Sequence, residues 1–399
     1  MTTPVRLVTR EFMRDPYPSL RAIREQRAAT PIDAAGLRAW VVTRYDDART
    51  LLAHPDVGKD LVANQEAILR ASVLRPEKLR GIPLALRRHM LDRDEPDHTR
   101  LRGLVSDFFS GPAITAWRPR IEQVTAHLLA GLPFGEEIDL IEHFTRPLAR
   151  TVTAELLGVP AGDEAPFPAW VNALLTSFQR EDLRRSADHL VAFIRTLLRH
   201  RAADPGDDVA SRLAARAAAG ELTENEAIAS VHVLMTGGLE PLNGIANAVH
   251  ALLHHPDQLA ALRADPGLLS GCVEETLRYE SPFRMLTPRF ARAPVPLTDL
   301  TIPANEMILV CPAAAGRDPS RFVDPDRFDI TRNAKAHLGF GRGSHRCLGA
   351  QLGRIEMTVA LSALLATAPG IRLAREPLWQ PGLFMRRLHT LPVVLPRRS

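Results

Sequence analysis

One short segment, 337–350 (HLGFGRGSHRCLGA), limits the chemistry of this chain more than any other stretch. Four glycines surround its single cysteine, Cys347. Glycine permits positive φ angles and lets the backbone approach a ligand closely. Apolar residues at helical spacing follow directly in 352–365. The sequence therefore predicts that Cys347 lies in a tight turn at the N-terminal end of a helix.

The predicted position of Cys347 favours a reactive thiol. Backbone amides at a helix N-terminus point toward the sulfur, and the helix dipole favours an anion. Both effects are expected to lower the pKa of the thiol, and a thiolate there is a metal ligand or a nucleophile. The alternative is a structural cysteine, because an isolated cysteine usually packs as a small hydrophobe. A hydrolase nucleophile would need a base and an oxyanion hole, and His345 is the only base in the loop.

The loop also fits a longer pattern, F-G-x-G-x-H-x-C-x-G. Its fixed positions are Phe340, Gly341, Gly343, His345, Cys347 and Gly349. The pattern resembles the haem-binding loop of the cytochrome P450 family. The resemblance implies that Cys347 is the thiolate ligand of the iron in haem b (iron protoporphyrin IX). It also implies that Phe340, Gly341 and Gly349 line the haem and that His345 donates to a haem propionate.

Composition narrows the functional class further. The chain has 399 residues, is 45% hydrophobic, and contains no apolar run long enough for a transmembrane helix. Its N-terminus lacks a signal-peptide pattern, and its three widely spaced cysteines argue against a disulfide framework. The net charge of +4 comes from interspersed charges of both signs. We therefore expect a cytoplasmic protein with neither a nucleic-acid nor a membrane partner.

A second basic segment, 94–105 (DEPDHTRLRGLV), places His98 and Arg102 on one helical face. Taken alone, this is a solvated basic helix. It resembles the P450 helix whose histidine and arginine bind the haem propionates, and arginine can bind a carboxylate through two hydrogen bonds. Arg289, in a segment with strand character, matches a third residue of that family that reaches a propionate.

A long apolar run begins at the capping box Thr223–Glu226 and has no strong stop before 254–256. About 32 helical residues would span ~48 Å, and the apolar surface predicts a buried helix. Its middle, 235–243 (MTGGLEPLN), contradicts helix propensity, since an internal proline costs ~3 kcal/mol. Such conflicts concentrate at functional sites, although a simple kink is the alternative explanation.

This stretch resembles the oxygen-binding helix of the P450 family. The resemblance implies that Gly237 and Gly238 make room for O2 and that Glu240 supplies protons. The family usually has threonine at the next position, where this chain has Pro241. Other groups that could replace the missing hydroxyl are Thr236, Asn243, ordered water and a substrate hydroxyl.

The pair Glu275 and Arg278 forms an E-x-x-R sequence in the next expected helix. An exposed pair at this spacing contributes only about 0.2–0.5 kcal/mol. Its place in the chain resembles the structural E-x-x-R of P450s, which binds an arginine of the following meander. That arginine is Arg327 or Arg332, and the sequence P-x-R-F around Arg327 favours Arg327.

The resemblance also implies a mostly apolar substrate pocket. The expected contacts are Leu61, Val62, Val233, Gly237, Met285, Leu286, Phe384 and Met385. The last two lie at the tip of an expected C-terminal hairpin.

The resemblance covers essentially the whole chain. It implies a mainly α fold with small β-sheets, forming a single haem domain over 1–399. The implied function is a monooxygenase that oxidises a small, mostly apolar molecule of secondary metabolism with O2. Electrons would come from a ferredoxin or flavodoxin with its reductase, and the arginines near Arg342 and Arg346 would suit an acidic partner.

Two other functions stay open. Pro241 is compatible with a P450-type oxidase or peroxygenase that performs coupling or desaturation without inserting oxygen. A haem-binding sensor or sequestering protein with little turnover is the second alternative.

Overall fold

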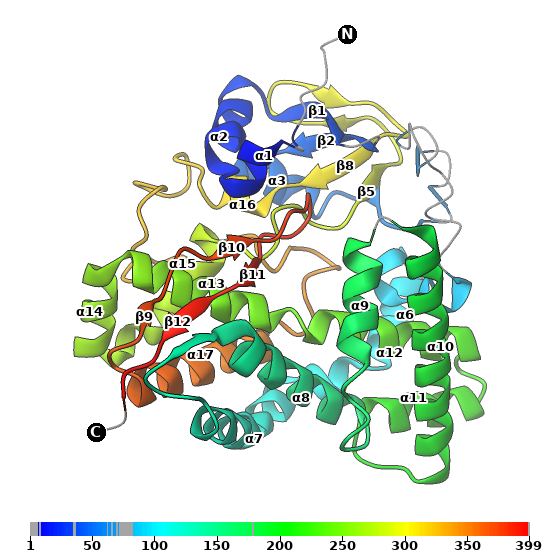
Figure 1. The fold of residues 1–399 in the computed structure, drawn as a ribbon. Helices are drawn as coiled ribbons and strands as arrows, with labels where there is room; N and C mark the ends of the chain where they lie inside the picture. The colour runs from blue at the N-terminus through cyan, green and yellow to red at the C-terminus, as the bar shows by residue number, and fades with distance from the viewer. Residues whose placement is uncertain are drawn as a thin grey trace.

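The computed structural model describes residues 7, 9–34, 37–61, 63–64, 67–68, 71, 83–177 and 179–397. Figure 1 shows a sheet with the N-terminal helices at the top and a larger helical part beneath it. The expected class, mainly α with small sheets, is confirmed.

The largest sheet has the strand order β1-β2-β8-β5-β3. Its strands are β1 (Ala29–Ala34), β2 (Leu37–Val42), β3 (Val57–Gly58), β5 (Arg289–Ala291) and β8 (Met307–Val310). The helices beside it are α1 (Arg10–Arg14), α2 (Tyr17–Gln26), α3 (Tyr45–Leu51) and α16 (Pro312–Ala315). Side chains alternate across a strand. Val41 accordingly packs with residues of α1 and α2, whereas Val42 packs with residues of α3.

The helical part surrounds one large hydrophobic core. Its α-helices are α6 (Asp97–Gly103), α7 (Gly111–Ala130), α8 (Arg146–Leu157), α9 (Phe167–Thr176), α10 (Arg180–Ala203), α11 (Val209–Ala218), α12 (Glu224–Gly238), α13 (Pro241–His254), α14 (Pro256–Ala264), α15 (Leu269–Tyr279) and α17 (Ala350–Thr367). Shorter turns are the 3-10 helices η1 (Leu84–Leu86), η2 (Met90–Asp92), η3 (Ser106–Phe109) and η5 (Pro266–Leu268), and the π-helix η4 (Ile141–Thr145).

The long helix expected from Thr223 onward is two helices. Its capping box is confirmed, because Thr223 and Glu226 bond reciprocally at the start of α12. The helix then ends at Gly238, and α13 begins at Pro241. Proline is tolerated at the first helical position, where its missing amide would have no partner anyway. Breaking the helix avoids the cost of an internal proline.

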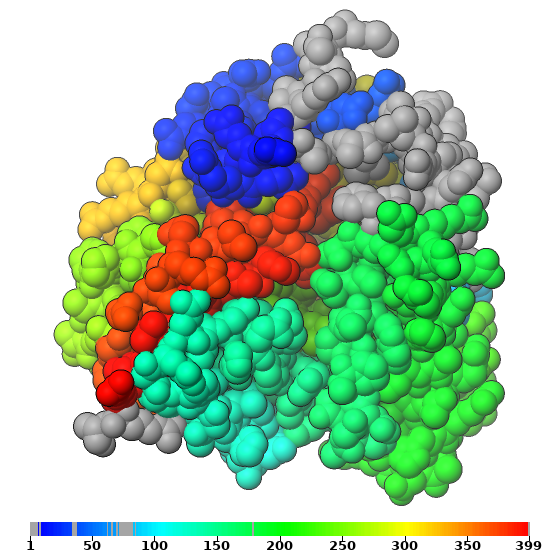
Figure 2. Space-filling model, viewed as in Figure 1, coloured from blue at the N-terminus to red at the C-terminus, as the bar shows by residue number. Residues whose placement is uncertain are grey.

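Three smaller sheets complete the fold, and C-terminal strands contribute to two of them. Strands β4 (Glu137–Asp139), β12 (Pro392–Val394) and β9 (Arg372–Leu373) form one, β10 (Leu378–Trp379) and β11 (Leu388–Thr390) another, and β6 (Val295–Pro296) and β7 (Thr301–Ile302) a third. Figure 2 shows the orange-to-red C-terminal segment crossing the surface between the blue N-terminal residues and the teal residues. The β10–β11 pair is the expected hairpin. In the described ranges, no helix is both long and apolar enough to cross a membrane.

Candidate functional site

Glycines shape the loop that carries Cys347. Gly341 (φ 68°) and Gly343 (φ 74°) adopt the left-handed conformation that other residues rarely take. A Cβ at Gly343 would also lie 2.7 Å from a backbone oxygen just after α3. The Cys347 amide donates to the Phe340 carbonyl at 2.9 Å, and Gly349 is the N-cap of α17. The predicted turn at a helix N-terminus is confirmed.

The Cys347 side chain is exposed, whereas the other two cysteines are buried. Desolvation by the surrounding protein nevertheless raises the pKa of the thiol above its ordinary value. The Gly349 amide and the charge of Arg102 act in the opposite direction without overcoming it. The expected lowering by a backbone amide is therefore present, but burial of the thiol outweighs it.

Nitrogen donors gather beside the loop. The rings of His98, in α6, and His345 have centroids 4.2 Å apart. Burial, followed by the charges of Lys59, His98, Arg289 and Arg102, lowers the pKa of His345 to about 2. The structure thus brings the predicted cofactor-binding residues His98, Arg102, Arg289 and His345 together from separate elements.

Lys59 joins this group, although the sequence did not indicate it. It follows β3, is only 2% exposed, and its ammonium group donates to the Thr287 hydroxyl. Burial and then the charge of Arg289 lower the pKa of Lys59 to about 7. An isolated lysine gives no sequence signal. Only the pairing of β3 with β5 brings Lys59 close to Arg289.

These donors fit the carboxylates of a haem. The Nε2 atom of His98 and the Nε atom of Arg289 are buried without a partner in the described part of the chain. Folded proteins rarely leave such groups unpaired, and charge-assisted bonds to carboxylates would satisfy them. A porphyrin bound at Cys347 would bring two propionates to this neighbourhood. The residues present therefore fit the expected cofactor.

One face of α12 is open. Gly237 is exposed, and a Cβ there would meet no atom within 4 Å. Val233 and Thr236 are half-buried, and the Thr236 hydroxyl is buried with no partner among the described residues. Gly238 differs, because its Cβ would lie 2.5 Å from the Thr153 hydroxyl oxygen in α8. Gly237 therefore leaves room on the open face, whereas Gly238 permits close packing of α12 against α8.

Glu240 lies in the break between α12 and α13. Burial raises the pKa of its carboxyl, while the charge of Arg387 and a hydrogen bond from Asn243 act to lower it. The Asn243 amide donates to Glu240 Oε2 at 2.8 Å, and Arg387 also donates to Asn172 in α9 at 3.0 Å. Arg387 was not predicted. A raised pKa lets a carboxyl keep its proton to higher pH, which favours a role as a general acid.

Two histidines that were also not predicted lie near this face. His232, one turn before Thr236, has its ring centroid 6.0 Å from that of His89. Burial lowers the pKa of both to about 3, so both rings are neutral at pH 7. Each ring buries an Nδ1 atom that has no partner within the described ranges. The backbone of Leu86 accepts a hydrogen bond from His232, which leaves Nδ1 of His232 as the acceptor.

The expected substrate contacts separate into groups. Leu61 and Phe384 pack against one hydrophobic cluster, and Met285 lies fully buried inside it. Leu286 packs against a different cluster, and Met385 is half-buried in a bridge to Phe283. Val62 lies outside the described residues. The prediction for Met285 is wrong, because core side chains enclose it completely.

The E-x-x-R pair forms a buried network. Glu275 and Arg278 are both 0% exposed, and two hydrogen bonds of 2.7 Å join their side chains. The third side chain is Arg332, whose Nε lies 3.4 Å from Glu275 Oε1. Arg327 contributes only its carbonyl, which accepts from Arg278 at 3.0 Å. The prediction of Arg327 as the ionic partner is wrong, because its side chain is exposed to solvent.

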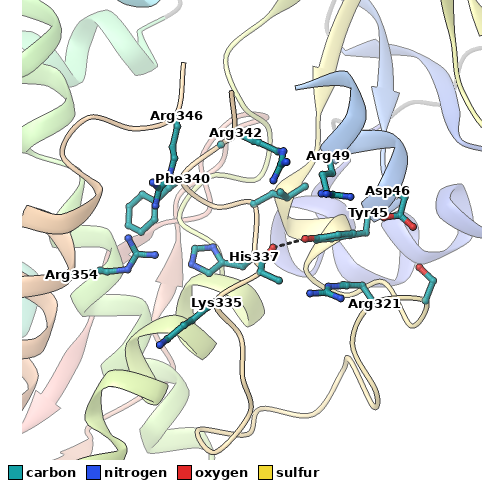
Figure 3. Close-up of a pocket in the computed structure, with 14 residues that line it drawn as sticks. Tyr45, Asp46, Arg49, Arg321, Lys335, His337, Phe340, Arg342, Arg346 and Arg354 are labelled. Atoms are coloured by element: carbon teal, nitrogen blue, oxygen red, sulfur yellow. Dashed lines mark hydrogen bonds between the residues drawn. The ribbon is translucent and has the colours of Figure 1, made fainter. Parts of the chain in front are cut away.

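A basic hollow lies at the outer side of the Cys347 loop (Figure 3). Its cavity measures about 630 Å³. The positively charged side chains that line it are Arg49, Arg321, Lys335, Arg342, Arg346 and Arg354. Asp46 is the only carboxylate in its lining. Beneath it, Glu274 accepts hydrogen bonds from His337 at 3.1 Å and from Arg354 at 3.0 Å, which fixes the loop to α15.

Comparison with known proteins agrees with this geometry. A model of the family described as Cytochrome P450 matches residues 165–367. Cytochrome P450 107B1 of Saccharopolyspora erythraea is 41% identical over 387 residues, which cover 96% of this chain and 95% of that protein. The chain belongs to the cytochrome P450 family. As a P450, it is an oxidoreductase with a haem-iron cofactor, and it depends on a redox partner.

Two further relatives are named as monooxygenases. The P450 monooxygenase PikC of Streptomyces venezuelae is 38% identical, with 96% of this chain and 92% of PikC covered. The structure of the tirandamycin C-bound P450 monooxygenase TamI superposes with a TM-score of 0.92 at 36% identity. The superposition covers 98% of this chain and all of the TamI chain. The expected P450 fold is confirmed, and these named activities favour an enzyme over a haem-binding sensor.

Proposed function

We propose that this P450 inserts one oxygen atom of O2 into a small organic substrate, with Cys347 as the iron ligand of haem b. The observation that carries the proposal is the exposed Cys347, together with buried donors of His98 and Arg289 that have no partner among the described residues. Bound haem supplies the oxygen-activating chemistry. The chain, acting as one haem domain, supplies the thiolate, the contacts to the propionates, a shaped pocket and protons.

Residues on both sides of the cofactor have separate roles in this proposal. Lys59, His98, Arg102, Arg289 and His345 bind the propionates, and Phe340, Gly341 and Gly349 form the loop under the haem. Gly237 leaves space for O2. Glu240 would supply a proton. The Thr236 hydroxyl, four residues earlier and without a partner among the described residues, would pass it toward the open face.

Cys347→Ala tests the iron ligand. The reduced carbon monoxide complex of the wild type should show the red-shifted Soret band of thiolate-ligated haem, and the variant should lose it. Cys272→Ala is the control, because it removes a buried thiol of α15 that lies outside the loop. A variant at Cys347 that kept the shifted band would refute thiolate ligation.

The substrate proposed here is a secondary metabolite with a mostly apolar body and at least one hydroxyl or amide N–H. Val233 and Phe384 contact the body, and Nδ1 of His232 accepts from the polar group. A buried acceptor without a donor carries a free-energy cost that such a substrate would remove. Titration of oxygenated and deoxygenated members of a compound library, followed through the haem spin state, tests this. His232→Phe should abolish the preference for the oxygenated members.

A ferredoxin or flavodoxin with an acidic surface is the proposed electron donor. Its carboxylates would face the basic hollow beside the Cys347 loop, and complementary charge accelerates such encounters. Turnover with an acidic ferredoxin should fall steeply as ionic strength rises.

A second candidate function rests on Pro241. This residue offers neither a hydroxyl nor an amide where P450s usually have threonine, so a coupling, desaturation or peroxide-driven reaction is the alternative. Turnover under isotopically labelled O2, with and without added peroxide, separates the two functions. Label in the product supports monooxygenation, and an oxidised product without label supports the alternative.

A further inference from the structure

A second cluster of possible ligands lies on α13, outside the haem site. His250 and His254 are one helical turn apart, and Glu376 comes from the segment between β9 and β10. One ligand atom from each of the three residues lies within 4.8 Å of the other two. Nε2 of His254 is 3.5 Å from a Glu376 carboxylate oxygen. Two ligand atoms of a tetrahedral zinc ion lie about 3.3 Å apart, so small side-chain movements would complete such a site.

The hydrogen bonds of His254 prepare it for metal binding. Its Nδ1 atom lies 2.9 Å from the His250 carbonyl oxygen. A carbonyl only accepts, so Nδ1 carries the hydrogen and Nε2 keeps its lone pair on the side of Glu376. Metal-binding histidines commonly donate their second nitrogen to a carbonyl in this way, which fixes the tautomer and the ring orientation.

His250 provides a second, independent observation. Its Nε2 atom is buried and has no hydrogen-bond partner in the part of the chain that is described. Its ring contacts that of His254, with centroids 4.2 Å apart, and meets Trp379 edge-on at 5.1 Å. A buried nitrogen without a partner needs an explanation, and coordination or an ordered water at a metal would supply one.

The position in the fold also favours a cation. His254 is the last residue of α13, where backbone carbonyls without helical partners carry partial negative charge. Glu376 is 75% exposed at its side chain and adds a full negative charge. His254 and Glu376 are exposed and His250 is half-buried, so an ion can approach the cluster from solvent.

We propose that His250, His254 and Glu376 bind a divalent transition-metal ion, Zn²⁺ in particular, with water completing the coordination. Two imidazoles and one carboxylate with an open position form a ligand set that zinc accepts. Calcium and magnesium prefer oxygen ligands and would not compete at this site.

The ion would join α13 to the C-terminal hairpin. Trp379, in β10, contacts His250. The Arg386 guanidinium lies 3.3 Å from the centroid of the Trp379 ring. Arg386 in turn binds Glu280 at 2.7 Å and follows Met385 in the loop between β10 and β11. Zinc would therefore hold this loop in place relative to the helix that begins at Pro241.

Equilibrium dialysis of untagged, haem-loaded protein against micromolar Zn²⁺, with elemental analysis, tests the site. The wild type should retain one more zinc ion per chain than His254→Ala or Glu376→Gln. Loss of a ligand should weaken the affinity by at least about tenfold, since even losing a supporting hydrogen bond costs 10- to 100-fold. Both side chains are exposed, so neither variant should unfold.

His200→Ala and Glu136→Gln are matched controls, because each removes an exposed residue of the same type elsewhere. Both should bind zinc as the wild type does. Zinc should also raise the thermal unfolding midpoint of the wild type and the controls but not of the two site variants. Equal zinc stoichiometry in the wild type and in His254→Ala, or an anomalous zinc signal elsewhere in crystals, would overturn the proposal.

Discussion

At the scale of single residues, Glu240 and Pro241 distinguish this P450 most clearly. Pro241 removes the hydroxyl that P450s usually place next to the acid, and Glu240 remains as a buried carboxyl with a raised pKa. In the proposed function, proton delivery would depend on groups around Glu240, including Thr236 and Asn243.

We expect Glu240→Gln to retain haem and its spectrum but to lower turnover about 100-fold, the lower end for a general acid. Because the pKa of Glu240 is raised in the folded state, the wild type loses stability as pH rises above the pKa of this carboxyl in the unfolded chain. Glutamine does not ionise, so the variant keeps that stability. Its free energy of unfolding should exceed that of the wild type at pH 8. Stopped-flow turnover and urea unfolding measure the two effects. Unchanged turnover would remove Glu240 from the proton path.

Pro241→Thr restores the usual hydroxyl and leaves α13 with an ordinary first residue. The coupling efficiency, which is the amount of product formed per NADPH consumed, should change. Pro241→Ala, which restores the amide alone, is the control. An identical fraction in all three proteins would mean that Pro241 only breaks the helix.

At the scale of elements, buried ion pairs hold the haem-side helices and loops together. Glu275 and Arg278 in α15 anchor the meander through Arg332, and Glu274 in the same helix anchors the Cys347 loop. These contacts join segments that are distant in sequence. For each of them we expect a different effect of substitution on stability.

Arg332→Ala should destabilise the fold by about 1–3 kcal/mol, because it leaves a buried carboxylate with one fewer charged partner. Arg327→Ala should stay within about 0.5 kcal/mol, since it retains the carbonyl that Arg278 uses. Chemical unfolding followed by circular dichroism compares them. The reverse order would restore Arg327 as the ionic partner.

Glu274 should contribute to stability in a pH-dependent way. Burial alone would raise its pKa, but hydrogen bonds and charges from His337 and Arg354 lower it to about 2. Because the folded-state pKa is lowered, this contribution is present above the unfolded-state value near pH 4.5 and is lost as pH falls toward 2. The stability difference between wild type and Glu274→Gln should therefore shrink between pH 5 and pH 2 in thermal unfolding experiments.

At the scale of the whole molecule, charge is unevenly distributed. The chain carries a net charge of only +4, yet six cationic side chains line the hollow beside the Cys347 loop. Arg49→Glu with Arg321→Glu should raise the KM for an acidic ferredoxin about tenfold, an effect that high salt reduces. Arg263→Glu, an exposed charge on α14, is the control. Turnover driven by a chemical reductant should be the same in all of them.

The sequence by itself determined the family, the cysteine loop and most helices, because these depend on local spacing. Glycines around Cys347, the capping box at Thr223 and the E-x-x-R pair each act within a few residues. The pKa of Cys347 was predictable only in part, since the sequence indicated the amide that lowers it but not the burial that raises it. Gly237 and Gly238 are adjacent and look alike in the sequence. Only the structure shows that Gly238 packs against Thr153 whereas Gly237 faces open space.

Only the tertiary structure decided which groups meet. Lys59 reaches the propionate donors through strand pairing, Arg332 replaces Arg327 through the path of the meander, and His250 meets Glu376 across 126 residues of chain. The physical reason is the same in each case. Spacing in sequence fixes which side chains share one helix or turn, whereas burial, charge and contact depend on segments that only the folded chain brings together.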